Sequence, residues 1–162
     1  MGLVTIRKIE KNDNENVWKI IRSVFEEHGI NRPGTAYHDE GLKNMCEMHS
    51  VPGSAYFVAM INGELVGGAG IFPSKGLPQD TCELVKMYLL PEARGKGIGK
   101  LMIQQCTDFA KSLGYGVIYL ETMPELSKAI GMYEKEGFIR LDKPMGNTGH
   151  YSCSIWMTKN IQ

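Results

Sequence analysis

The stretch that decides the fold is CELVKMYLLPEARGKGIGKLMIQQCTDFAKSLGY, residues 82–115. It opens with an apolar run, residues 84–90, and Pro91 ends this run because proline lacks the N–H that a strand ladder needs. A glycine-rich loop follows at residues 94–99, and apolar residues then recur at helical spacing as far as Leu113. The stretch therefore predicts a strand, a tight loop and a helix, in that order.

The loop and the start of this helix suit an anionic ligand. The first N–H groups of a helix have no partner within it and lie at the positive end of its dipole, so a phosphate is stabilised there. Three glycines let the backbone approach a ligand closely, and three basic side chains add positive charge. We therefore expect a diphosphate group at this loop. The residues concerned are Gly95, Gly97 and Gly99, and Arg94, Lys96 and Lys100.

The two common nucleotide-binding patterns do not fit this loop. In the Rossmann pattern G-x-G-x-x-G the third glycine would fall on Lys100 or on Met102, depending on the register. The P-loop pattern would need a glycine at Arg94 and a serine or threonine at Leu101. A glycine-rich turn without a ligand stays open as the alternative, and nucleotide binding is disfavoured.

Two motifs carry a resemblance to a known family. Arg94-x-x-Gly97-x-Gly99 resembles the Q/R-x-x-G-x-G/A signature of the GCN5-related N-acetyltransferases, the GNAT superfamily. AIGMYEKEGF, residues 129–138, resembles the A-x-x-x-Y-x-x-x-G-F segment of the same family. The resemblance implies one α/β (α+β) domain over residues 1–162. Its mixed, mostly antiparallel sheet would have about six to seven strands, flanked by about four helices.

The resemblance also implies acetyl-CoA as the cosubstrate, and no metal. The backbone of Met87 and Leu89 would contact the thioester carbonyl and the pantetheine arm, between strands that splay near Leu89 and Val117. Many members carry an asparagine that helps bind coenzyme A where this chain has Leu126. The implied cofactor-binding residues are Met87, Leu89, Arg94, Gly95, Lys96, Gly97, Ile98, Gly99 and Lys100.

Acetyl transfer to an amine needs a base for the amine, a donor for the oxyanion and an acid for the departing thiolate. Glu83 stands at the position of the catalytic glutamate in GNAT enzymes of the histone acetyltransferase type, and burial beside an apolar strand would raise its pKa. Tyr133 matches the motif tyrosine, which lies near the sulfur in the family. The alternatives are a structural glutamate and a core tyrosine.

The acceptor side is less determined by the sequence. The resemblance places it on the first two helices and their joining loop, which makes Tyr37 and His38 substrate-binding candidates beside the alternative of a solvated loop. His150 is a third candidate, because its ordinary pKa lies near neutrality. The TGHxxC pattern around it also resembles bacterial GNAT members that include domains fused to MarR-type regulators. A small-molecule amine and a peptide amine both remain open.

The rest of the chain alternates strands and helices. Asn62-Gly63 predicts a type I′ hairpin between strands at residues 55–60 and 64–72. Gly67-Gly68-Ala69-Gly70 would weaken the second of these strands or permit a bulge. Helices are expected at residues 14–25, 41–48 and 124–137. Further strands are expected at residues 3–9, 117–121, 138–141 and 152–158.

Composition excludes several function classes. Eighteen basic and eighteen acidic side chains cancel, which removes any global attraction to nucleic acid or to an anionic membrane. No apolar run is long enough to span a bilayer, and the N-terminus lacks the apolar core of a signal peptide. The four cysteines form no CxxC pair, which favours reduced thiols in the cytoplasm.

The sequence thus predicts an acetyl-CoA-dependent N-acetyltransferase that moves an acetyl group directly to a primary amine. The main alternative is a non-catalytic acyl-CoA-binding sensor, which would keep the loop without turning over. Transfer of a longer acyl group, or transfer to a hydroxyl, also remains open. A homodimer is expected from the habit of the family alone.

Overall fold

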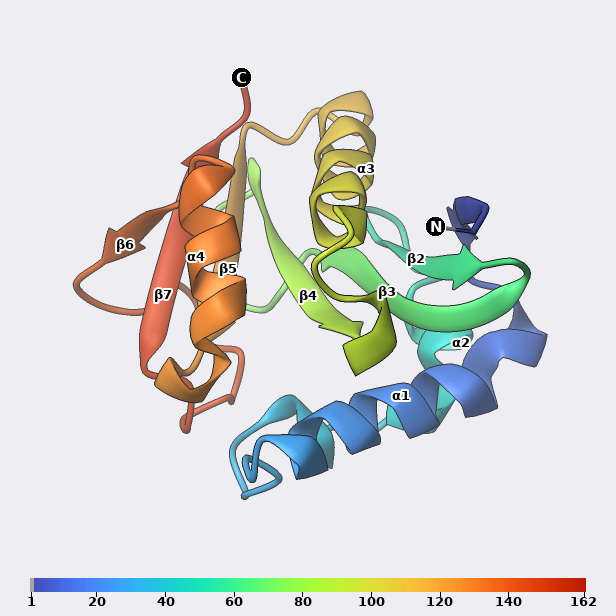
Figure 1. The fold of residues 1–162 in the computed structure, drawn as a ribbon. Coiled ribbons are helices and arrows are strands. Elements are labelled where there is room, and N and C mark those ends of the chain that lie inside the picture. The colour runs from blue at the N-terminus through green and yellow to red at the C-terminus, as the bar shows by residue number, and fades with distance from the viewer. Residues whose placement is uncertain (1) are drawn as a thin grey trace.

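The computed structural model describes residues 2–162, and over this range it has seven strands and four α-helices (Figure 1). The helices are α1 (Asn14–Glu27), α2 (Met45–Met48), α3 (Ile98–Ser112) and α4 (Ser127–Lys135). The strands are β1 (Val4–Lys8), β2 (Ala55–Ile61), β3 (Glu64–Phe72), β4 (Thr81–Leu89), β5 (Val117–Thr122), β6 (Ile139–Leu141) and β7 (Ile155–Asn160).

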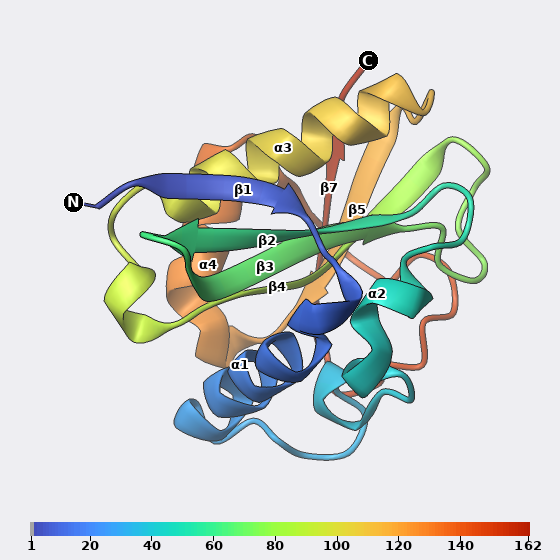
Figure 2. The ribbon, with the colours of Figure 1, turned by 90° about the vertical axis from the view of Figure 1, so that its right-hand side faces the viewer.

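The strands form one sheet in the order β1-β2-β3-β4-β5-β7-β6. Every neighbouring pair is antiparallel except β4 and β5, which are parallel. Helices α1 and α2 cover one face of the sheet, and α3 and α4 cover the other (Figures 1 and 2). The predicted fold class, a mixed and mostly antiparallel sheet flanked by helices, is confirmed.

The parallel pair of strands separates soon after it forms. Pairing runs only from Thr81 opposite Val117 to Glu83 opposite Tyr119, and the two strands then diverge (Figure 1). The sequence predicted that these two strands separate near Leu89 and Val117. The prediction for Val117 is wrong, because Val117 is paired with Thr81. Because parallel strands that pair at their starts can open only at their ends, the gap lies between Leu89 and the carboxyl end of β5. This gap places the site.

A β-bulge interrupts β4 at Lys86. Between the pairs Gly68–Tyr88 and Gly70–Val85, β3 contributes one residue and β4 contributes two. Lys86 adopts a φ of 48°, which is uncommon for a residue with a side chain. A bulge bends its strand and re-aims the neighbouring side chains, and bulges are frequent beside active sites.

The glycines of β3 allow close packing of backbone against backbone. A Cβ added at Gly70 would lie 2.5 Å from the carbonyl oxygen of Ala55, and one added at Gly68 would lie 2.5 Å from the ring of Tyr56. The run is therefore required by its neighbours on β2. The sequence allowed a bulge in β3, and β3 has one beside the run, where Val66 is the extra residue between the pairs Ala59–Gly67 and Met60–Leu65. The bulge at Lys86 belongs to β4 and was not predicted.

Local signals placed the other elements well. Asn62 and Gly63 have φ values of 51° and 81°, the left-handed region that the predicted type I′ turn requires. The last strand begins at Ile155 rather than at residue 152, because Ser152 belongs to a loop that bonds to the backbone of Gly34. Among residues 2–162, no helix has the length and hydrophobicity that crossing a bilayer requires.

We predict opposite stability changes for two glycine-to-alanine substitutions. Gly70→Ala should lower the free energy of unfolding by about 1–3 kcal/mol, because the new methyl group meets backbone that cannot move aside. Gly131→Ala is the matched control: it lies in α4 with nothing within 4 Å of the added Cβ, and it should stabilise the protein by up to about 1 kcal/mol. Urea unfolding measures both, and equal effects would contradict the packing argument.

Candidate active site

The glycine loop exposes backbone donors at the start of α3. The helix begins at Ile98 after Gly97, and its first backbone hydrogen bond runs from Leu101 N to Gly97 O at 3.2 Å. The N–H groups before Leu101 therefore precede the helical ladder. Gly95 and Gly97 have φ values of 72° and 79°, and a Cβ added at either would meet nothing within 4 Å. The loop is open on its outer side, as an anion site requires.

Arg94 braces this loop from behind. Its guanidinium forms a bidentate pair with Glu27 of α1 at 2.7 and 2.8 Å, and it also donates to the carbonyl of Leu89 at 2.9 and 3.0 Å. We predicted from the sequence that the charge of Arg94 would help bind the anionic ligand, but Glu27 already pairs with this charge. Lys96 and Lys100 are exposed and keep the expected position around the loop.

Gly99 joins the loop to the two elements that border the gap. A Cβ on Gly99 would lie 2.5 Å from the sulfur of Met132 on α4 and 3.3 Å from the terminal methyl of Met87 on β4. The start of α3, α4 and β4 therefore meet at this glycine. The meeting point places Met87, a predicted cofactor-contacting residue, next to the loop.

On the opposite face of the sheet, a small cavity of about 40 Å³ opens at the gap between β4 and β5. Its apolar wall includes Phe25 of α1, Tyr88 of β4 and Leu126 before α4. Four charged side chains also line it, although charged groups are rarely buried without a partner. These are Glu83, Lys86, Glu121 and His150.

Glu83 lies at the last paired position of β4, where the gap begins. Its side chain is only 5% exposed, and this burial raises the pKa of its carboxyl group to about 7, with a further rise from the charge of Glu121. Ser74 donates a hydrogen bond to it at 2.5 Å, which acts to lower the pKa. The carboxyl group is thus divided between its protonated and ionised forms near neutral pH.

Glu121 on β5 is held in the opposite state. Burial acts to raise its pKa, but His150, Thr148 and Tyr119 outweigh burial and lower it. Tyr119 donates to one carboxylate oxygen at 2.7 Å and Thr148 to the other at 2.5 Å. Two carboxyl groups that border one cavity therefore have pKa values shifted in opposite directions.

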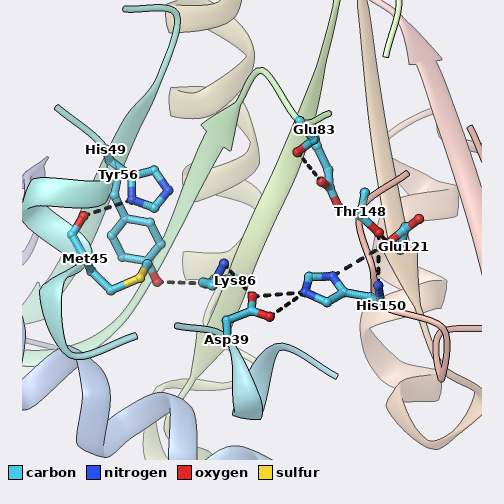
Figure 3. Close-up of polar contacts among 10 residues, drawn as sticks. Asp39, Met45, His49, Tyr56, Glu83, Lys86, Glu121, Thr148 and His150 are labelled. Atoms are coloured by element: carbon cyan, nitrogen blue, oxygen red, sulfur yellow. Dashed lines mark hydrogen bonds and ion pairs between the residues drawn. The ribbon is translucent and has the colours of Figure 1, made fainter. Parts of the chain in front are cut away.

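His150 links this carboxylate to a second ion pair (Figure 3). Its Nε2 donates to Asp39 at 2.8 and 2.9 Å, and its Nδ1 lies 3.7 Å from Glu121. Asp39 also accepts from Lys86, whose Nζ lies 3.1 Å away. Burial acts to lower the pKa of His150, but Asp39 and Glu121 raise it to about 9, so the imidazole is protonated at neutral pH.

These groups bear on the question of a metal. Side-chain atoms of Glu83, Glu121 and His150 lie within 4.8 Å of one another, the one such grouping within residues 2–162. A protonated imidazole has no nitrogen lone pair to give to a metal ion. We therefore interpret the grouping as an ion-pair network, and the absence of a metal stays a prediction.

Tyr56 supports the network from the side of α2 (Figure 3). Its hydroxyl donates to the carbonyl of Lys86 at 2.7 Å, which fixes the bulge. His49 packs its ring 5.2 Å from the ring of Tyr56 and bonds through Nδ1 to the carbonyl of Met45 at 2.9 Å. Burial lowers the pKa of His49 to about 4, so this second histidine is neutral and structural.

Tyr133 of α4 lies on the face opposite the cavity, packed edge-on against Phe138 with ring centres 5.8 Å apart. Burial raises its pKa above the ordinary value, so its hydroxyl keeps its proton at neutral pH. Burial also raises the pKa of Tyr88, and the nearby Tyr133 adds to this rise.

Two predicted substrate contacts lie elsewhere. The Tyr37 hydroxyl accepts from Arg22 at 2.5 Å, His38 bonds through Nε2 to the carbonyl of Asn31 at 3.0 Å, and neither ring lines the cavity. The residues that sequence reasoning missed are Lys86 and Glu121. The signal was a charged side chain within, or at the end of, an apolar strand.

Comparison with known proteins identifies the family. Residues 15–138 match the acetyltransferase (GNAT) family. This chain belongs to that family. YjgM, an N-acetyltransferase of Escherichia coli K12, is 38% identical over 157 residues, which cover 96% of this chain and 94% of YjgM. Membership of the GNAT family and the similarity to YjgM identify the protein as an acyltransferase.

Solved structures agree with the fold. A GNAT acetyltransferase from Staphylococcus aureus Mu50 superposes with a TM-score of 0.84 at 21% identity, covering 99% of this chain and all of that one. The PaiA N-acetyltransferase of Thermoplasma acidophilum was solved in complex with coenzyme A. It superposes with a TM-score of 0.73 at 20% identity, covering 98% of this chain and 99% of the PaiA chain.

We predict that the contribution of His150 to stability fades at high pH. Its folded pKa of about 9 lies above the ordinary 6.5, so the stabilisation is complete below pH 6.5 and is lost as the pH rises through 9. Relative to His150→Gln, the wild-type advantage in unfolding free energy should shrink by at most about 3 kcal/mol over this range.

The measurement is urea unfolding of both proteins at several pH values. The control is His38→Gln, which removes an exposed histidine outside the network and should change stability little at either end. An advantage of His150 that stays constant from pH 6 to above pH 9 would show that the ion pairs with Asp39 and Glu121 do not stabilise the fold.

Proposed function

We propose that this GNAT protein is an acetyl-CoA-dependent N-acetyltransferase that moves acetyl directly to a primary amine, without a covalent enzyme intermediate. The observation that supports this most is the position of Glu83, a buried carboxyl group with a pKa of about 7 at the point where β4 and β5 part. A base with a pKa near the working pH is the most effective one for taking a proton from an amine.

The cosubstrate would bind on the face that carries α3 and α4. The open N–H groups around Gly95 and Gly97 would hold the pyrophosphate, and the exposed Lys96 and Lys100 would add charge. The backbone of β4 at Met87 and Leu89 borders the gap through which the acetyl group would reach the cavity. The coenzyme A in the PaiA complex supports this class of cosubstrate.

The chemical step would use both sides of the gap. Glu83 would accept a proton from the amine, whose nitrogen would then attack the thioester carbonyl carbon. As the tetrahedral intermediate collapses, the carbon–sulfur bond breaks and the Tyr133 hydroxyl would donate its proton to the departing thiolate. The nitrogen loses its second proton to solvent as the amide forms, so the products are the N-acetylated amine and free coenzyme A. Glu83 would then release its proton to solvent and solvent would return one to Tyr133, so that an ammonium substrate releases one proton per turnover.

The alternative of a non-catalytic acyl-CoA sensor is less well supported. A sensor needs the glycine loop, but it gains nothing from the Glu83 carboxyl group, whose pKa is raised to about 7, in the cavity between β4 and β5. We call this cavity the acceptor cavity. Family membership also favours an enzyme. The four free cysteines suit the reducing cytoplasm that we propose as its compartment. One domain and a homodimer stay predictions.

A mass-detected screen tests the reaction class. The protein and acetyl-CoA would be mixed with a panel of small amines and peptides, and coenzyme A release would be followed alongside the products. An acetylated amine supports the proposal. Binding of acetyl-CoA without release of coenzyme A for any member of the panel would favour the sensor.

We predict that Glu83→Gln lowers kcat/KM at least about a hundredfold, because the amide cannot accept the proton. For the wild type, kcat/KM should rise with pH through about 7 and then level off, as Glu83 ionises. The polar groups that face this carboxyl group are those of Ser74, Glu121, His150 and Lys86. The pKa of His150 is about 9, so its ionisation does not account for a rise in kcat/KM near pH 7. In the variant the rise should be absent.

The control for this experiment is Glu64→Gln, which removes an exposed carboxylate on β3 and should leave the pH profile unchanged. Tyr133→Phe should lower kcat while leaving acetyl-CoA affinity intact, because only the proton donated to the thiolate is lost. Full turnover in both Glu83→Gln and Tyr133→Phe would overturn the assigned roles.

A further inference from the structure

The charges inside the acceptor cavity are separated into two ends (Figure 3). Glu83 and Glu121 converge at one end, with their carboxylate oxygens and a ring nitrogen of His150 within 4.8 Å of one another. Lys86 lies at the other end, paired with Asp39, and His150 stands between the two groups. The cavity therefore has a negative end beside the proposed base and a positive end about Lys86.

These charges nearly cancel. Lys86 and His150 contribute two positive charges, and Asp39 and Glu121 contribute two negative ones, so the ionised Glu83 that acts as the base leaves one negative charge. The ammonium group of an acceptor balances this charge before it gives a proton to Glu83. In a poorly hydrated site an unmatched charge is costly, so a carboxylate on the ligand needs a cation beside it, and Lys86 lines the cavity as that cation.

The ammonium group of Lys86 has more N–H donors than anionic partners in the described residues. An ammonium group has three N–H donors, and Asp39, 3.1 Å away, is the one anionic group that the described residues place within 4 Å of it. The side chain is only 7% exposed, so solvent supplies few acceptors. The bulge with its φ of 48° holds this lysine at the cavity wall despite the conformational cost. A carboxylate on the ligand would complete its hydrogen bonds.

The segments that border the cavity are held in place by contacts between distant parts of the chain. The loop from residue 142 to residue 154 crosses the acceptor side, where Asn147 bonds to the carbonyl of Lys75 at 2.8 Å and Ser152 bonds to the carbonyl of Gly34 at 3.1 Å. Arg32 and Glu125 form an ion pair at 3.0 Å that joins the α1–α2 loop to the segment between β5 and α4. These contacts favour a compact ligand over an extended chain.

We propose that the acceptor is a small free amino acid, bound as its zwitterion. Its ammonium group would lie between Glu83 and Glu121, and its carboxylate would bind Lys86. This inference rests on the proposed function and narrows it: a peptide N-terminus lacks the adjacent carboxylate and would leave the positive end of the cavity without a partner.

A matched substrate series tests the proposal with the unaltered protein. Each of several free amino acids would be compared with its carboxamide and with a dipeptide that has the same N-terminal residue. The free amino acid should have a kcat/KM about tenfold or more above that of its amide, because the amide loses a charge-assisted hydrogen bond to Lys86. Equal or better use of the amides and dipeptides would overturn the proposal.

Lys86→Met tests the assigned contact. The preference for the free amino acid over its amide should fall to near one, whereas Lys86→Arg should restore part of it. Lys19→Met, which removes an exposed lysine on α1, is the control and should keep the wild-type preference. Because the readout is a ratio between two substrates of the same protein, a general loss of stability would not reproduce it. An unchanged ratio in Lys86→Met would refute the role of Lys86.

Failure of the proposed function would look different. In that case no member of the series would be acetylated, and calorimetric titration of the coenzyme A-bound protein with amino acids and their amides would decide the inference. Tighter binding of the free amino acids, lost in Lys86→Met, would support the zwitterion site. Absent or equal binding would count against it.

Discussion

β4 pairs with β5 only from Thr81 to Glu83, and beyond that point the edge of β4 that faces β5 has no strand to bond with. Buried backbone N–H and C=O groups are almost always paired, so an opening in the middle of a sheet needs another source of partners. A ligand with amide groups, such as the pantetheine arm of the proposed cosubstrate, would supply them. The open parallel pair is thus the constraint that places the glycine loop, the cavity and Glu83 around one gap.

The bulge at Lys86 connects this opening to the acceptor side. It adds a residue to β4 where β3 has none to match, and the hydroxyl of Tyr56 holds the freed carbonyl at 2.7 Å. Tyr56 in turn packs against Gly68 and Gly70, which have no side chains to displace it. The glycine run of β3 therefore does more than bend a strand. It leaves room for the aromatic ring that fixes the buried lysine at the cavity wall.

How much the sequence could predict depends on the distance along the chain between interacting residues. The strand, loop and helix at residues 82–115 follow from local signals: Pro91 ends one element, and the glycines precede the next. Glu83 was selected from the family resemblance by its position before the loop, and the structure places it where β4 and β5 part, while its role as the base stays a prediction. The hairpin at Asn62-Gly63 is equally local, and the structure agrees with it.

The ion-pair network could not be predicted in the same way. His150 and Asp39 are 111 residues apart, and Arg94 and Glu27 are 67 apart, so no periodicity or spacing links either pair. Sequence reasoning therefore assigned Arg94 a free charge that the fold had already neutralised. It selected His150 for its ordinary pKa near neutrality, whereas two carboxylates raise that pKa to about 9.

A buried network of this kind is an unusual way to stabilise a protein. Removing charges from water costs free energy that their attraction repays only in part, and an apolar core of similar size is often as stable. The network gives the cavity two carboxyl groups with different pKa values, which an apolar core would not provide. Thr148, Tyr119 and His150 keep Glu121 ionised, while burial raises the pKa of Glu83 to about 7. Two carboxyl groups whose environments separate their pKa values can divide the work, one holding a cation and the other exchanging its proton.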